Sequence, residues 1–133
     1  MSVPVTVPVK PDELVMWMLA HSGQGSIRSD PNIVHRAIRD LKEEFPDLLS
    51  EFDFFPGRLF PFSQLLARVL FRAELSGLLG TLNPFFDEQP IQPEVAARVR
   101  EFLNRRIDAS VRERLNLLTK RFDEECRRLA SGQ

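Results

Sequence analysis

The sequence predicts a mostly α-helical fold with a small β element and a long C-terminal helical extension. Apolar residues recur at helical spacing over four stretches of the chain. Six of the eleven phenylalanines lie between positions 52 and 71, where their burial would form a core. A helical segment at 64–75 is followed by Gly77-Leu78-Leu79-Gly80 and then by an extended segment. This order of elements is that of a winged helix.

Length and composition indicate one globular domain. The chain has 133 residues, of which 43% are hydrophobic and 28% are charged, a balance that is not typical of a disordered tail. Within it we expect an N-terminal arm at 1–11, a winged-helix-like core at 12–90 and a helical extension at 91–133. Residues 1–92 carry 8 Lys and Arg against 12 Asp and Glu, whereas 93–133 carry 10 against 7. The positive charge is therefore concentrated at the C-terminal end.

The cysteine count and the apolar runs exclude several classes of site. Cys126 is the single cysteine, so the chain has neither an internal disulfide nor a cysteine-based zinc site. The longest apolar run, 14–20, is much shorter than the roughly 20 residues that a membrane span needs. We therefore expect a cytoplasmic protein without a membrane segment and with an unreactive thiol.

The first half of the chain contains two helices with clear start signals. Asp12 is expected to cap a helix that runs to about His21 and ends at Gly23-Gln24-Gly25, with Trp17 at the margin of its buried face. Asp30 and Pro31 predict the start of a second helix, which Pro46 ends. One further helical turn is expected at 47–51.

The central helix is predicted at 64–75. Ser63 is placed to cap it, and its buried stripe consists of Leu65, Leu66, Val69, Leu70 and Ala73. The opposite face mixes cations with apolar groups and is typical of a surface that binds a partner; it consists of Gln64, Arg68, Phe71, Arg72 and Leu75. Gly77 ends the helix, and Leu78-Leu79 begins the extended segment that 81–86 continues.

The C-terminal extension is predicted to be a long helical segment after a loop at 87–92. Pro93 belongs at the start of this segment, and two apolar stripes that are out of step around Asp108 indicate a break there, with a capping box at Ser110. The second stripe has near-heptad spacing and consists of Val111, Leu115, Leu118, Phe122 and Leu129. It could pack within the chain or pair with a second copy, and we favour a homodimer slightly.

The sequence contains no recognisable catalytic or metal-binding pattern. His21 and His35 are not paired with a nucleophile or with metal ligands, and we expect both to be half-exposed helix residues. The arginines after position 93 alternate with carboxylates, which is more often a salt-bridged surface than a nucleic-acid surface. We therefore predict a non-enzymatic protein without a metal or cofactor.

Several motifs together resemble the winged-helix-like domains of the YwgA and Panacea (SocA-type antitoxin) kind over about residues 12–90. They are Gly25-Ser26-Ile27-Arg28, aromatic residues before Pro61-Phe62-Ser63, and Leu66 and Leu70 leading to Ser76-Gly77-Leu78-Leu79. In those domains a Gly-Pro-aromatic-Ser turn starts the helix, whereas here Arg58-Leu59-Phe60 separates Gly57 from Pro61. The resemblance implies a bacterial regulatory or antitoxin-like interaction domain without catalysis and transfers no functional residue.

Two functions follow from these predictions. The first is a regulator that binds duplex DNA through the central helix and dimerises through its last helix. Its DNA-binding residues would be Arg58, Gln64, Arg68 and Arg72. The second is a subunit that docks a protein partner through its aromatic stretch and last helix. Its partner-binding residues would be Phe71, Leu115, Leu118 and Phe122.

Overall fold

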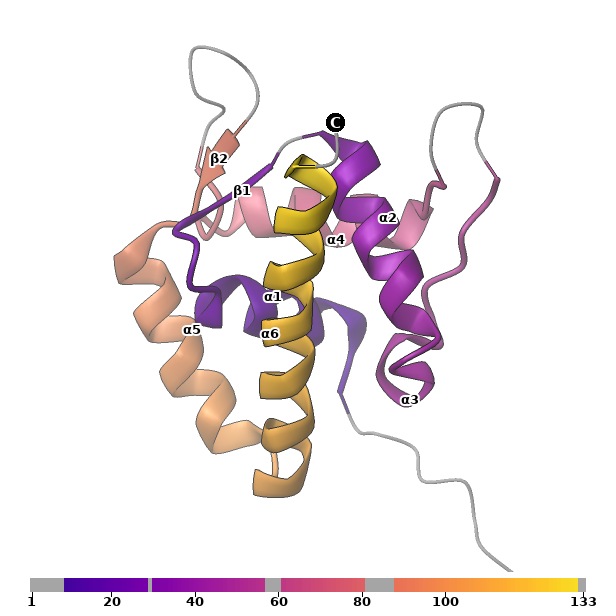
Figure 1. The fold of residues 1–133 in the computed structure, drawn as a ribbon. Coiled ribbons are helices and arrows are strands. Elements are labelled where there is room, and N and C mark those ends of the chain that lie inside the picture. Colours follow the sequence, from indigo (N-terminus) through magenta and orange to yellow (C-terminus); the bar gives the residue numbers. More distant parts are fainter. Residues whose placement is uncertain (1–8, 29, 57–60, 81–87, 132–133) are drawn as a thin grey trace, which may run out of the picture.

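The computed structural model describes residues 9–28, 30–56, 61–80 and 88–131. These residues form six helices and two short strands (Figure 1). In chain order they are α1 Pro11–His21, β1 Ser26–Arg28, α2 Pro31–Lys42, α3 Pro46–Leu49, α4 Gln64–Leu75, β2 Glu88–Pro90, α5 Pro93–Arg106 and α6 Ala109–Ser131. The prediction of a mostly helical chain with a small β element and a long C-terminal helix is confirmed.

Helix α1 lies at the centre of the helical packing. It contacts α4, α5 and α6, and α6 also packs along α2. Figure 1 shows α6, in yellow, crossing in front of α1 with α5 on one side and α2 on the other. The C-terminal extension therefore forms part of the main helical assembly rather than a separate arm.

The helix starts largely follow the predicted caps. The Asp30 carboxylate accepts the Asn32 N–H at the start of α2, and the Ser63 hydroxyl accepts the Leu66 N–H at the start of α4. The prediction for α1 is wrong by two residues, because Lys10 occupies the N-cap and Asp12 lies inside the first turn. There Asp12 still faces the positive end of the helix dipole, where a carboxylate is stabilising.

The β element differs from the prediction. The sequence predicts a loop at 87–92, but β2 pairs antiparallel with β1 in the register Ser26 to Pro90 and Arg28 to Glu88. On the other edge of the same segment, the Gly80 N–H donates to the Pro90 carbonyl at 2.8 Å, and Leu79 bridges Ile91. Pro90 fits because it supplies only an acceptor to this ladder. The predicted extended segment at 81–86 lies outside the described residues.

The order of helices and extended segments around the sheet follows the order that the sequence predicts. Helix α1 is followed by strand β1, by helices α2 and α4 with the short α3 between them, and by an extended segment at Leu78–Gly80 that bridges the segment containing β2. Gly77 ends α4 in the left-handed conformation, at φ +85°. Helix α4 therefore lies directly before the second half of the β element, and it is the third helix of this region when the four-residue α3 is left out of the count.

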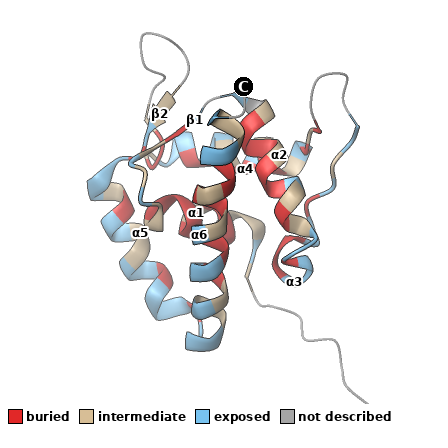
Figure 2. Cartoon of the chain, in the orientation of Figure 1, coloured by how far each residue is buried: buried red, intermediate tan, exposed pale blue. Residues whose placement is uncertain are grey.

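The core lies between α1, α2 and α6 rather than in the aromatic stretch. Trp17, predicted at the margin of α1, is only 1% exposed, and Figure 2 shows α1 buried over most of its length. Within the described part of the aromatic stretch, Phe52 is fully buried, Phe54 and Phe62 are half-buried, and Phe55 is exposed. The aromatic stretch thus covers one edge of the core and does not form its centre.

The predicted break in the C-terminal helical segment is confirmed. Helix α5 ends at Arg106 and α6 begins at Ala109, on the two sides of Asp108. The Asp108 carbonyl accepts the Arg112 N–H, so the first helical bond of α6 starts at Asp108. Ser110 is therefore inside the first turn of α6 and not at its cap, in contrast to what the capping-box pattern predicts.

Candidate functional site

The outward side of α4 is the surface on which the predicted binding residues meet. Leu66, Val69 and Ala73 are buried on the inner side of this helix. Because an α-helix has 3.6 residues per turn, the positions at steps of four, three and four on the opposite side share one face. This face, which we call the α4 face, consists of Gln64, Arg68, Phe71 and Leu75, and all four residues are exposed.

Two large apolar side chains lie next to each other on the α4 face. Phe71 is 57% exposed and Leu75, one turn further along, is 71% exposed. Single exposed apolar residues are common on protein surfaces, but neighbouring large ones on one helix face mark candidate interaction sites. The described part of the chain supplies no residue that covers them.

Polar contacts within the chain border the α4 face on both sides. On one side, the Arg72 guanidinium donates two hydrogen bonds to the Asp12 carboxylate, at 2.6 and 2.7 Å, and this contact raises the pKa of Arg72. On the other side, the Gln89 amide donates to the Glu74 carboxylate at 2.6 Å. The contact with Asp12 uses Nε and Nη2 of Arg72, so the DNA-binding role predicted for Arg72 would have to use Nη1 or break this contact.

A small cleft lies at the N-terminal end of the α4 face. Its volume is about 220 Å³, and it is lined by Glu51, Asp53, Phe55, Gln64, Leu65 and Arg68. Arg68 has no ion-pair partner among the described residues, whereas Asp53 lies 3.8 Å from Lys42. Arg58, the fourth residue predicted to bind DNA, lies outside the described residues.

His35 accepts a hydrogen bond from the residue that precedes α4, a role that the sequence did not predict. The sequence predicts a half-exposed residue, but His35 is 3% exposed. Its Nδ1 accepts the Ser63 N–H at 3.0 Å, and its ring stacks on Phe62 with the centroids 4.8 Å apart. Burial lowers the pKa of His35 to about 4, so the ring is neutral at pH 7 and Nδ1 can accept this bond.

The predicted partner-binding residues of the last helix are not available to a partner. Leu115 and Leu118 are 0% exposed and Phe122 is 3% exposed, because α1 and α2 cover this stripe within the same chain. The prediction that these three residues form a dimer seam is therefore wrong. Near-heptad spacing predicts that another helix covers an apolar stripe. It does not decide whether that helix belongs to the same chain or to a second copy.

Polar side chains of α6 also hold other parts of the chain. The Asp123 carboxylate accepts the Ser22 hydroxyl at 2.9 Å and the Gly23 N–H at 3.1 Å, which fixes the turn between α1 and β1. The Trp17 indole donates to the Asn116 side chain at 3.2 Å. Helix α6 is thus joined to α1 by both apolar and polar contacts.

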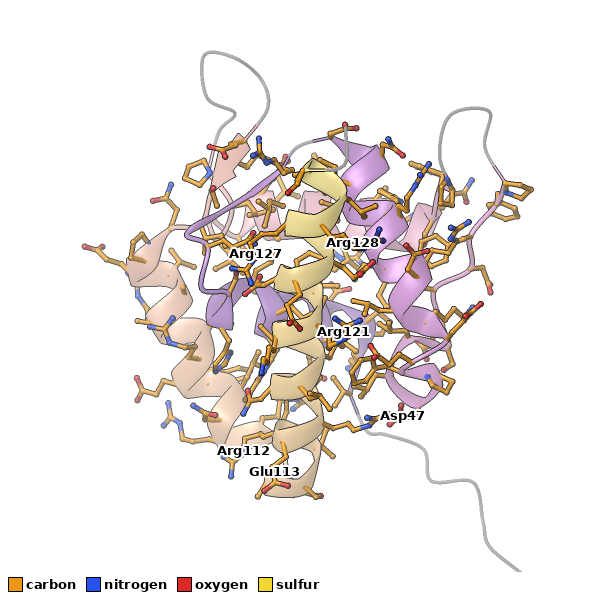
Figure 3. All side chains as sticks on the ribbon, viewed as in Figure 1. Asp47, Arg112, Glu113, Arg121, Arg127 and Arg128 are labelled. Carbon is orange, nitrogen blue, oxygen red and sulfur yellow. The ribbon has the colours of Figure 1, made fainter. Side chains whose placement is uncertain are left out.

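The arginines of α6 are mostly engaged in ion pairs, as the salt-bridge interpretation predicted. Arg114 pairs with Asp47 at 3.0 Å, Arg121 with Glu44 at 3.0 Å, and Arg128 with Glu125 at 2.8 Å. Figure 3 shows Arg121 and Arg128 on the side of α6 that faces α2, and Arg127 on the other side. The hydrogen bonds from Arg114 and Arg128 lower the pKa values of Asp47 and Glu125.

Two clefts border α6, and their linings are dominated by charged and polar groups. The larger, of about 870 Å³, lies between α2 and α6 and contains the pairs of Arg39 with Asp40 and of Arg121 with Glu44. The smaller, of about 570 Å³, lies between β1 and α6 and includes Arg28, Glu88 and Arg127. Both linings contain cations and carboxylates, so neither cleft carries charge of a single sign.

The thiol and the potential metal ligands lie in inert surroundings. Burial, together with the charges of Asp123 and Glu125, raises the pKa of the Cys126 thiol to about 12, so this thiol is unreactive. In the described part of the chain, no three His, Cys, Asp or Glu side chains converge as metal ligands would. No helix among the described residues combines the length and the apolar character that crossing a membrane requires.

Comparisons of the chain with models of known protein families, with curated proteins and with solved structures gave no match. The resemblance to the YwgA and Panacea domains therefore stays a prediction from the motifs. The candidate site rests on the geometry of the chain alone.

Proposed function

We propose that this protein is a non-enzymatic interaction module that docks a protein partner on the α4 face. The observation that carries the proposal is the exposure of Phe71 and Leu75, one turn apart on the outward side of α4. Aromatic side chains at the centre of a patch with polar borders are the groups that contribute most to protein–protein affinity. Phe71 is the expected anchor.

The charges around α4 favour a protein partner over duplex DNA. Glu51 and Asp53 line the same cleft as Arg68, Glu74 borders the other end of the helix, and Arg72 is neutralised by Asp12. Carboxylates at these positions repel phosphates, and residues 1–92, with 8 cations against 12 carboxylates, have a net charge of −4. A protein partner would bury Phe71 and Leu75, whereas a DNA groove gives them few apolar contacts.

The proposal is tested by affinity capture with a matched pair of double variants. Phe71→Ala with Leu75→Ala removes the apolar part of the α4 face. Phe102→Ala with Leu117→Ala removes two exposed apolar residues of similar size from α5 and α6, where Phe102 is 60% exposed. The expected result is a partner that wild type and the α5–α6 variant both capture from a lysate of the source cells and that the α4 variant loses.

The captured protein is then purified and titrated. Removing an anchor at the centre of an interface costs about 2 kcal/mol or more, so Phe71→Ala should weaken binding at least about 30-fold. Phe102→Ala should bind like wild type. Equal affinity of the Phe71→Ala and Phe102→Ala variants for the purified partner would contradict docking on the α4 face.

DNA binding is the second candidate function, because α4 exposes Gln64 and Arg68, and in a winged-helix domain the helix before the hairpin would be the recognition helix. Under this proposal, each lost phosphate contact should reduce the salt slope of binding by about one unit. The test is a DNA titration at two salt concentrations on wild type and on Arg68→Ala with Arg72→Ala. If wild type binds duplex DNA no better than this double variant, the DNA proposal fails.

A further inference from the structure

We infer that the partner on the α4 face is an amphipathic helix with one carboxylate in the middle of its apolar stripe, placed opposite Arg68. The inference rests on the proposed function and specifies the chemistry of the partner. The residues of the α4 face follow one another at steps of four, three and four, which is the spacing of a coiled-coil seam. A helix with the same spacing is therefore the partner shape that matches this face.

Arg68 determines what the partner must carry. Within the seam formed by the α4 face, Arg68 lies between Gln64 and Phe71. A helix packed on this face would therefore cover its guanidinium. Arg68 makes no ion pair with a described residue, and the nearby Arg72 is already bound to Asp12. Glu51 and Asp53 line the same cleft, but neither forms an ion pair with Arg68, and Asp53 lies 3.8 Å from Lys42. Because a cation that is desolvated without a direct ion pair is costly, we expect the facing seam position of the partner to supply a carboxylate that contacts Arg68 itself.

A second copy of this chain does not meet that requirement. In a parallel pair of α4 helices, each Arg68 would face the other Arg68 in the seam. In an antiparallel pair, the side of α4 that carries Arg68 and Arg72 would face the same side of the other copy. Both arrangements place like charges together, and the Asp12 carboxylate on this side already accepts two hydrogen bonds from Arg72. The charge pattern therefore selects a different protein.

The borders of the face are compatible with one docked helix. The Arg72–Asp12 contact on one side and the Gln89–Glu74 contact on the other are satisfied within the chain, so the partner need not compensate them. Phe55, 58% exposed beside the N-terminal end of α4, extends the apolar surface into the small cleft. The partner helix can therefore gain apolar contacts at both ends of the seam, with its carboxylate between them.

The test uses three synthetic helical peptides that share one apolar stripe and differ only at the central seam position, which is Glu, Gln or Lys. Each labelled peptide is titrated with the full chain by fluorescence anisotropy. The Glu peptide should bind at least about tenfold tighter than the Lys peptide. Arg68→Glu should reverse this order, and Arg68→Gln should make the Glu and Lys peptides similar. Circular dichroism confirms that each variant is folded.

Two further variants locate the binding. Phe71→Ala should weaken all three peptides, and Phe102→Ala should weaken none. Equal binding of the three peptides to wild type, an order that Arg68→Glu leaves unchanged, or the absence of binding would each overturn the inferred partner chemistry. A wild-type dimer in light scattering that Phe71→Asp converts to monomer would overturn it in favour of a second copy. None of these peptide results decides the capture experiment, which tests the proposed function separately.

Discussion

Helices α4 and α6 carry similar residues but use them in opposite ways. Both combine arginines with an apolar stripe at seam-like spacing. On α6 the stripe is fully covered by α1 and α2, and Arg114, Arg121 and Arg128 are held in ion pairs. On α4 an additional apolar pair points to solvent beside Arg68, which pairs with no described carboxylate. The difference shows that the fold, rather than the composition of a helix, decides whether an apolar stripe is buried or exposed.

The largest effect that tests this comparison is a loss of stability from the α6 stripe. Leu118→Ala removes a fully buried side chain, and such changes cost about 2–5 kcal/mol in the free energy of unfolding. Phe71→Ala removes a larger group from the surface and should change the free energy of unfolding by no more than about 0.5 kcal/mol. Urea denaturation measures both. Equal destabilisation by the two variants would erase the distinction between core and interface.

The second effect concerns His35, a buried residue that accepts a hydrogen bond at the start of α4. Its folded pKa of about 4 is below the ordinary value of 6.5, so the unfolded chain binds the proton more tightly between these pH values. The contribution of neutral His35 to the free energy of unfolding is therefore fully present only above about pH 6.5. It falls as the pH drops toward 4, by up to about 3 kcal/mol.

His35→Gln isolates this contribution. The variant also loses stability in acid, because carboxylates such as Asp47 and Glu125 have lowered pKa values and are protonated there. Between pH 6.5 and 5, however, its unfolding free energy should change less than that of wild type. Parallel pH profiles of wild type and His35→Gln in urea denaturation would show that His35 is not buried in its neutral form.

A smaller effect is expected from the polar contact that joins α6 to the turn after α1. Asp123→Ala leaves the Gly23 N–H and the Ser22 hydroxyl without their acceptor. An unsatisfied partly buried donor costs about 1–3 kcal/mol, so thermal unfolding should shift downward by several degrees. Glu113→Ala, an exposed control within α6, should have a smaller effect. The same melting temperature for both variants would mean that the Asp123 contact contributes no stability.

The smallest effect is expected at the border of the α4 face. Arg72→Ala breaks the exposed ion pair with Asp12, and such pairs contribute little to stability because solvent screens them. The variant should therefore keep its unfolding midpoint in urea within experimental error while Asp12 loses this partner. A clear downward shift of that midpoint would show that the pair determines how α4 packs on α1, and the α4 face would then depend on it.

The sequence predicted the elements that have local signals. Ser63 and Gly77 mark both ends of α4, and the two apolar stripes that are out of step locate the break at Asp108. Strand β2 was missed because Glu88–Pro90 has no apolar alternation and forms only by pairing with β1, about sixty residues earlier. The formation of β2 depends on a tertiary contact, and local propensity does not predict such contacts.

The candidate site was predicted only in part. Helical periodicity alone predicts that Gln64, Arg68, Phe71 and Leu75 share one face, and their exposure agrees with this prediction. Coverage of the α6 stripe by α1 and α2 could not be predicted from spacing, because it depends on how distant helices pack. Similarly, His35 resembles a surface histidine in sequence, and its partner Ser63 lies 28 residues away.

The measurement that tests the central claim most directly is amide hydrogen exchange of the chain with and without the partner obtained by affinity capture. The account predicts that the partner slows exchange in α4, over 64–75, and that the outer turns of α5 around Phe102 keep their rate. Slower exchange in α5 or in α6, with α4 unchanged, would contradict docking on the α4 face.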